Sequence, residues 1–82
     1  MPRSLTYHVV LRRDPDGQHF VEFGDYDRSV AREERDELSR QTQLTWPARS
    51  GRPTYHLASL PDAAQSTIDA EVARRNQQEN SQ

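Results

Sequence analysis

Apolar side chains fall on every second position between Leu5 and Arg12, and this two-residue period predicts a strand with one buried face. A second segment with strand character follows after a turn and ends at Gly24. A third, from Thr54 to Leu60, lies much later in the chain and is too short to show which of its faces is buried. Three strands are therefore predicted.

The turn between the first two strands has the sequence Asp14-Pro15-Asp16-Gly17. Proline presets φ at the second position of a type I turn, and glycine can adopt the left-handed conformation that closes a three-residue hairpin loop. In that register Leu11 faces Val21 on the apolar face, and Val9 faces Phe23 beside that pair. Turn chemistry and alternation agree, so an antiparallel hairpin is predicted.

Two further segments have the spacing of amphipathic helices. The first runs from about Arg28 to Gln41 with a thin apolar line, and Asp27 can act as its N-cap. The second enters through Pro61 and repeats an apolar side chain every four residues from Ala64 to Val72. Residues 76–82 are polar without any apolar anchor, so we expect a flexible tail there.

The order β-β-α-β-α predicts an α+β domain whose three-stranded, mainly antiparallel sheet carries both helices on one face. Residues 1–75 would form this single domain. A core of such size supplies only about 3–5 kcal/mol of stability, so binding to a partner, or to a second copy in a homodimer, would help.

Composition narrows the classes of function. The chain has 82 residues and no cysteine, which excludes disulfides and thiolate metal sites. No apolar run approaches the roughly 18 residues that a membrane helix needs. We expect a cytoplasmic protein.

Charge is distributed unevenly along the chain, although the net charge is only −2. Residues 22–37 hold seven acidic and three basic side chains, whereas residues 38–53 hold three arginines and no acid. Such segregation can orient a protein on a charged partner. The acidic candidates for binding that partner are Asp25, Asp27, Glu33, Glu34, Asp36 and Glu37. The alternative interpretation is a solvated helix face with internal arginine pairs.

Candidate chemistry is sparse. The three histidines, His8, His19 and His56, lack the spacing of metal motifs, so no metal or cofactor is expected. Asp25 and Asp27 lie two residues apart at a strand-to-helix junction, where an enzyme can hold an acid–base pair. Neither a nucleophile nor a glycine-rich loop accompanies them, so no enzymatic activity is expected.

A second type of interface is suggested by the loop after the first helix. Trp46 can stack on a base, and Arg49 and Arg52 carry guanidinium groups suited to phosphate. Against this, the isoelectric point is about 5.9. A small regulator that contacts nucleic acid through this loop is the alternative hypothesis.

The segments 7–10, 16–17, 22–28 and 34–36 together give the chain a family likeness. It resembles small proteins of phages and plasmids, and it is similar to the anti-CRISPR proteins in size and acidic α+β character. The likeness covers about residues 7–38, and its most specific part is the Phe-Gly-Asp-Tyr-Asp-Arg run at 23–28. It implies a non-catalytic inhibitor that binds a CRISPR effector complex and blocks nucleic-acid binding. It transfers no individual site residue.

Overall fold

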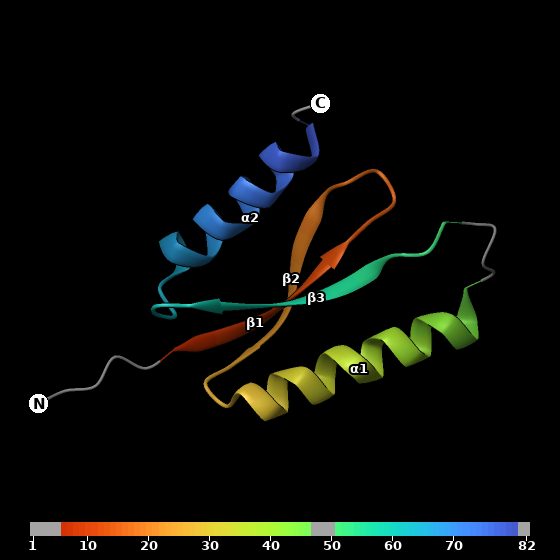
Figure 1. Cartoon of the computed structure of the whole chain (residues 1–82), viewed down its shortest axis with the longest axis horizontal. Helices are drawn as coiled ribbons and strands as arrows, with labels where there is room; N and C mark the ends of the chain where they lie inside the picture. The colour runs from red at the N-terminus through yellow and green to blue at the C-terminus, as the bar shows by residue number, and fades with distance from the viewer. Residues whose placement is uncertain (1–5, 47–50, 81–82) are drawn as a thin grey trace, which may run out of the picture.

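A computed structural model describes residues 6–46 and 51–80, residues 79 and 80 by their backbone alone (Figure 1). The elements in chain order are β1 (Tyr7–Arg13), β2 (His19–Asp25), α1 (Arg28–Thr45), β3 (Thr54–Leu60) and α2 (Gln65–Asn80). The central strand β1 pairs antiparallel with both of its neighbours, in the order β2-β1-β3. The predicted α+β class, the β-β-α-β-α order and the antiparallel sheet are therefore confirmed.

The hairpin between β1 and β2 closes as its turn sequence predicts. Gly17 has φ of 89°, the left-handed conformation that glycine adopts without strain. Its N–H donates to the carbonyl of Asp14 at 2.9 Å, and the N–H of Asp14 donates to the carbonyl of Gln18 at 2.9 Å. These two bonds close the turn at the end of the β1–β2 pairing.

The register beyond the turn differs from the prediction at one point. Leu11 faces Val21, as predicted, but the register then shifts and Val10 faces Phe23. The predicted pairing of Val9 with Phe23 is wrong because one extra residue of β2 forms a β-bulge. The pattern of apolar and polar residues does not reveal a bulge, because the residues before it and the residues after it each still alternate between the two faces of the sheet.

Both faces of β1 are buried. Val9, Val10 and Leu11 each have 0% exposure, and consecutive side chains of a strand point to opposite faces. Val9 and Leu11 belong to a cluster that packs against Ile68 and Val72 of α2. Val10 lies outside that cluster, on the other face of the sheet.

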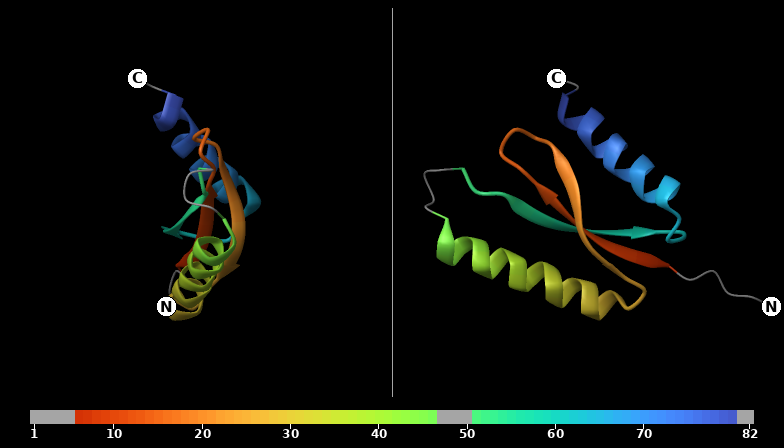
Figure 2. Two further views of the ribbon diagram at one scale, coloured as in Figure 1. Left: turned by 90° about the vertical axis from the view of Figure 1, so that its right-hand side faces the viewer. Right: turned by 180° about the vertical axis from the view of Figure 1, so that it is seen from behind.

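Helix α1 covers this other face. Its Ala31 is fully buried, and its Thr42 hydroxyl donates to the Tyr55 hydroxyl at 3.3 Å. Tyr55 is the partner of Arg12 across the sheet, so it lies on the face of Val10. In Figures 1 and 2 the strands accordingly run between α1 and α2.

The helices therefore lie on opposite faces, whereas the sequence predicted both on one face. The physical reason is the continuous apolar run at the centre of β1, which only a helix on each side can remove from water. An uninterrupted apolar run in a strand indicates that both faces of the strand are buried. In β1 this run is short, and the alternating residues on either side of it make the strand look buried on one face.

Both helices extend further at their C-terminal ends than predicted, whereas α2 begins only at Gln65, after the predicted entry through Pro61. Helix α1 continues to Thr45, where the N–H of Trp46 donates to the Thr42 carbonyl at 2.9 Å. Helix α2 includes residues 76–80, which were expected to form a flexible tail, while residues 81–82 lie outside the described chain. The Asn76 side chain explains this extension, because its Oδ1 accepts the His19 N–H at 2.7 Å and so anchors the helix to β2.

The junction between β2 and α1 is fixed by a close approach at Gly24. A Cβ at this position would overlap the phenol ring of Tyr7. That ring also meets Tyr26 edge to face, with centroids 4.9 Å apart and an interplanar angle of 66°. Glycine is thus required so that the first residue of β1 can pack on the end of β2.

Replacing Gly24 by alanine should lower the free energy of unfolding by about 1–3 kcal/mol, because the added methyl group displaces the Tyr7 ring. Urea denaturation followed by circular dichroism measures this loss. In a Tyr7→Ala background the same Gly24→Ala change should cost much less. An equal cost in both backgrounds would contradict the contact.

Candidate functional site

Three of the six acidic candidates lie on the outward side of α1. Glu33, Asp36 and Glu37 are spaced three and four residues apart, so they are neighbours on one helix face. They lie on the side of α1 away from its buried residues, Ala31 and Thr42. The Asp36 side chain is 64% exposed and that of Glu37 is 45% exposed. The structure thus brings these three carboxylates together at the surface.

Arginines of the same helix accompany these acids. Arg35 donates to Asp36 through Nη2 at 2.9 Å, and Arg40 donates to Glu37. The bonds from Arg40 and from the Gln41 amide hold the pKa of Glu37 below its ordinary value, so Glu37 is ionised at neutral pH. Exposed pairs of this kind contribute only about 0–1 kcal/mol, so a partner's cation can replace them.

Asp25 and Asp27 lie at the start of α1 and shape its entry. Asp27 Oδ1 accepts from the Ser29 N–H at 2.9 Å and from the Ser29 hydroxyl at 2.6 Å, which confirms the predicted N-cap. Asp25 Oδ1 accepts the Asp27 N–H at 2.7 Å. The hydrogen bond from the Ser29 side chain, followed by that from its backbone, lowers the pKa of Asp27. Both carboxylates therefore have a structural role.

Glu34 lies apart from the outward group. Helical spacing places it nearer the buried side of α1 than Glu33, Asp36 and Glu37, and like Glu37 it is half-buried. The six acidic candidates consequently divide into three on the outward side of α1, two at its N-terminus and one on its flank.

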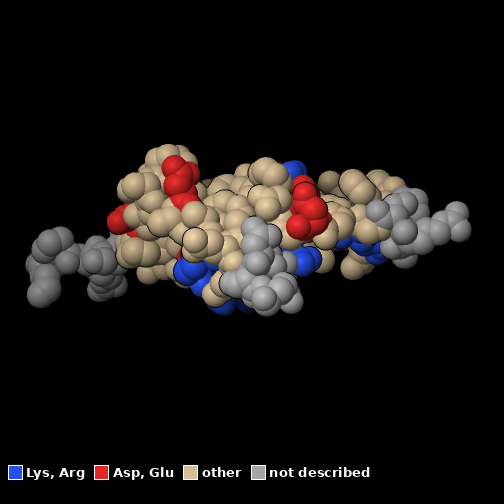
Figure 3. Space-filling model, turned by 90° about the horizontal axis from the view of Figure 1, so that it is seen from above, with Lys and Arg blue, Asp and Glu red and all other residues tan. Residues whose placement is uncertain are grey.

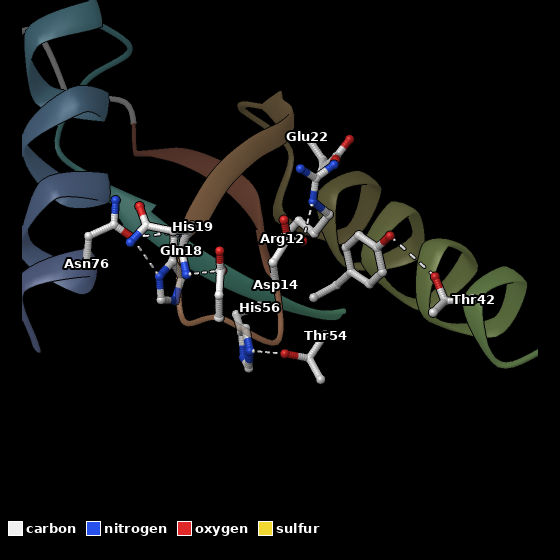
Figure 4. A network of polar contacts seen from close by, with 11 residues as sticks. Arg12, Asp14, Gln18, His19, Glu22, Thr42, Thr54, His56 and Asn76 are labelled. Carbon is white, nitrogen blue, oxygen red and sulfur yellow. Dashed lines mark hydrogen bonds and ion pairs between the residues drawn. The ribbon is translucent and has the colours of Figure 1, made fainter. Parts of the chain in front are cut away.

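The three histidines do not form a single group, because His8 lies apart from the other two. His8 faces Ser59 across the sheet, and its Nδ1 shares a hydrogen bond of 2.8 Å with the Ser59 hydroxyl. His56 faces Leu11, so it lies on the opposite face from His8. His19 lies beside Asn76 (Figure 4). Among residues 6–46 and 51–80, no three His, Asp or Glu side chains lie close enough to hold a metal ion.

On the face of the molecule on the side of α2, the described residues form no large patch of one sign. Figure 3 shows separate small groups of acidic and basic side chains there on a surface of mostly uncharged residues. On α2 itself, Glu71 accepts from Arg74 Nη2 at 2.6 Å and from Arg75 Nε at 2.7 Å. The charged side chains of this part of α2 therefore pair with one another.

The alternative loop site is only partly described. Trp46 is 44% exposed, so its indole is accessible for stacking. Arg52 is half-buried, and its Nε is buried without a hydrogen-bond partner among the described residues. Arg49 lies outside the described residues.

A hollow that the sequence did not indicate lies beside Trp46. Its volume is about 620 Å³, and it opens between the hairpin turn and the segment that follows α1. The residues that matter for its chemistry are Arg12, Asp14, Asp16, Trp46, Pro53 and Tyr55. We call this hollow the turn pocket. Its residues come from three separate parts of the chain, which explains why no local motif predicts it.

No protein-family model, curated protein or solved structure matches this chain. Within the described part of the chain, neither helix has the length and apolar character required to cross a membrane. Function is therefore inferred from the chain's own residues.

Replacing Asp27 by alanine should lower the free energy of unfolding by about 0.5–2 kcal/mol, because the N–H groups of the first turn of α1 lose their acceptor. Thermal and urea denaturation measure the loss. Asp27→Asn keeps an acceptor oxygen and should cost little. Asp36→Ala, on the same helix but away from the cap, should change stability by less than about 1 kcal/mol. Equal effects of Asp27→Ala and Asp27→Asn would contradict the cap.

Stability should fall as the pH drops from about 7.5 to about 5, and His56 should cause part of this fall. Burial, followed by the nearby charges of Arg75 and His19, lowers the pKa of His56 from its ordinary 6.5. The unfolded chain therefore takes up a proton at a higher pH than the folded chain, which favours unfolding in acid.

The variant His56→Gln should reduce the slope of unfolding free energy against pH in this window. Below about pH 4.5 both proteins should lose stability alike, because the unfolded chain then protonates carboxylates, such as Glu37, whose lowered pKa keeps them ionised in the folded chain. An unchanged slope between pH 7.5 and 5 would show that His56 has no such role.

Proposed function

We propose that this protein binds another protein through the outward side of α1 and catalyses no reaction itself. The observation that supports the proposal is the group of carboxylates Glu33, Asp36 and Glu37 on the outward side of α1, where the Asp36 side chain is 64% exposed and that of Glu37 is 45% exposed. Carboxylates spaced along one helix face complement a surface rich in arginine or lysine. Proteins that handle nucleic acid have such surfaces.

The identity of the partner is proposed from the sequence resemblance. A protein similar to the anti-CRISPR proteins would bind a CRISPR effector subunit in the host cytoplasm, and its carboxylates would occupy the groove that otherwise holds nucleic acid. A CRISPR effector is therefore the first partner to test, and affinity capture from cells that contain an interference system is the route to it.

A nucleic-acid interface at Trp46 and Arg52 is the second candidate, and the exposed indole favours it. Asp14 and Asp16 line the same hollow as Trp46 and would repel phosphate. A gel-shift with random DNA at low salt distinguishes the two proposals, because only the second expects retardation.

Reversing the charge of Glu33, Asp36 and Glu37 to arginine should weaken binding to the captured partner by about tenfold or more and should make the remaining affinity less dependent on salt. Isothermal calorimetry at several salt concentrations measures both quantities, and circular dichroism checks the fold.

Two matched single variants show whether the loss of affinity depends on the position of the changed residue or only on the net charge of the protein. Glu33→Arg and Asp69→Arg make the same change in charge at exposed positions, on α1 and α2 respectively. Only Glu33→Arg should weaken the complex. If both variants, or neither, change the affinity, the outward side of α1 is not the interface.

A further inference from the structure

The turn pocket lies where α1 ends and leaves part of the sheet uncovered. Arg12 of β1 and Tyr55 of β3 are direct partners in the sheet and form its floor. The hairpin turn with Asp14 and Asp16 forms one wall, and Trp46 belongs to the opposite segment. A volume of about 620 Å³ lies within the range of about 300–1,000 Å³ that is usual for ligand sites.

Bonds that belong to the fold hold these walls in place. The Tyr55 hydroxyl accepts from Thr42 of α1 at 3.3 Å, and the Trp46 N–H closes the last turn of that helix. A Cβ placed on Gly51 would lie 3.4 Å from Pro15, so the segment before β3 packs against the hairpin turn. The Tyr55 side and the backbone around the pocket are therefore held by the fold, which lowers the entropic cost of binding.

The charge of the pocket favours a cation. Arg12 is the only basic side chain among the described residues that line it. Its Nε donates to Asp14 at 2.9 Å, and its Nη1 donates to Glu22 at 2.6 Å (Figure 4). Its guanidinium carbon also lies 4.7 Å from the centre of the Phe20 ring. Arg12 is thus already neutralised by its neighbours.

One carboxylate remains without a cationic partner among the described residues. Asp16 Oδ1 accepts only a backbone bond, from the Gln18 N–H at 3.0 Å. Asp16 is exposed, so a ligand can reach its second oxygen. Trp46 and Tyr55 also line the pocket, and aromatic rings attract cations.

We propose that the turn pocket binds an arginine side chain of the partner protein. The planar guanidinium stacks against the Trp46 and Tyr55 rings, and its N–H groups donate to Asp16. This inference rests on the proposed function, since it assigns a second contact to the same basic partner. A phosphate group would meet Asp14 and Asp16, so it is the wrong ligand for this pocket.

The fluorescence of Trp46 tests this proposal directly, because the chain has one tryptophan. The full chain is titrated with acetyl-Gly-Arg-Gly-amide. A saturable change in emission is expected. The matching citrulline peptide, which has the same shape without the charge, should bind about tenfold more weakly or not at all. Inorganic phosphate should cause no saturable change.

Three results of these titrations would overturn the proposal. They are equal binding of the citrulline and arginine peptides, saturable binding of phosphate at Trp46, and no saturable change with the arginine peptide. Equal or tighter binding of the corresponding lysine peptide would overturn the assignment to arginine.

The variant Asp16→Asn locates the contact. Asparagine keeps an oxygen for the Gln18 N–H and removes only the charge, so the fold should persist and affinity for the arginine peptide should fall by about three- to tenfold. Asp69→Asn, the same change on α2, should leave affinity unaltered. Equal affinities of wild type and Asp16→Asn would contradict the placement.

The two proposals fail separately. If the arginine peptide does not bind while Glu33→Arg still weakens the partner complex, the pocket assignment is wrong and the proposed function stands. If the peptide binds wild-type protein and loses affinity in Asp16→Asn, the pocket assignment holds even where the α1 variants leave the complex intact.

Discussion

The fold depends on the need to remove Val9, Val10 and Leu11 of β1 from water on both sides at once. Each of these side chains contributes about 1.5–3 kcal/mol on full burial, and a strand presents them alternately to two faces. The strand must therefore be central, and a helix must cover each face. In a chain of 82 residues, that requirement uses most of the secondary structure. The outer sides of the helices and the sheet's uncovered end then carry the functional groups proposed above.

Local signals in the sequence predicted those features that depend on one or two neighbouring residues. The turn at Gly17, the cap at Asp27 and the bounds of β3 follow from backbone preferences that act over a few residues. The bulge in β2 and the placement of the helices do not, because they depend on contacts between distant segments. Asn76 is a clear example: a polar residue near the chain end becomes an anchor only because β2 presents the His19 N–H to it.

The site was predicted in part for the same reason. Helical spacing places Glu33, Asp36 and Glu37 together, but it does not show which side of the helix the sheet covers, and therefore which carboxylates face outward. The most specific part of the family likeness, residues 23–28, has structural roles at several positions: Gly24 lies under Tyr7, Tyr26 meets the same ring, and Asp27 caps α1. These structural roles are sufficient to explain residues 23–28. The run therefore marks the strand-to-helix junction and is no independent evidence of an interface.

The two proposed contacts differ in the kind of energy they supply. On the outward side of α1, a partner's cations must compete with Arg35 and Arg40 for Asp36 and Glu37, so each exchange yields little net energy and depends strongly on salt. Stacking on the rings of the turn pocket loses less energy to salt and requires a planar cation of the right size. The helix would therefore bring a basic partner to the surface, and the pocket would select among such partners.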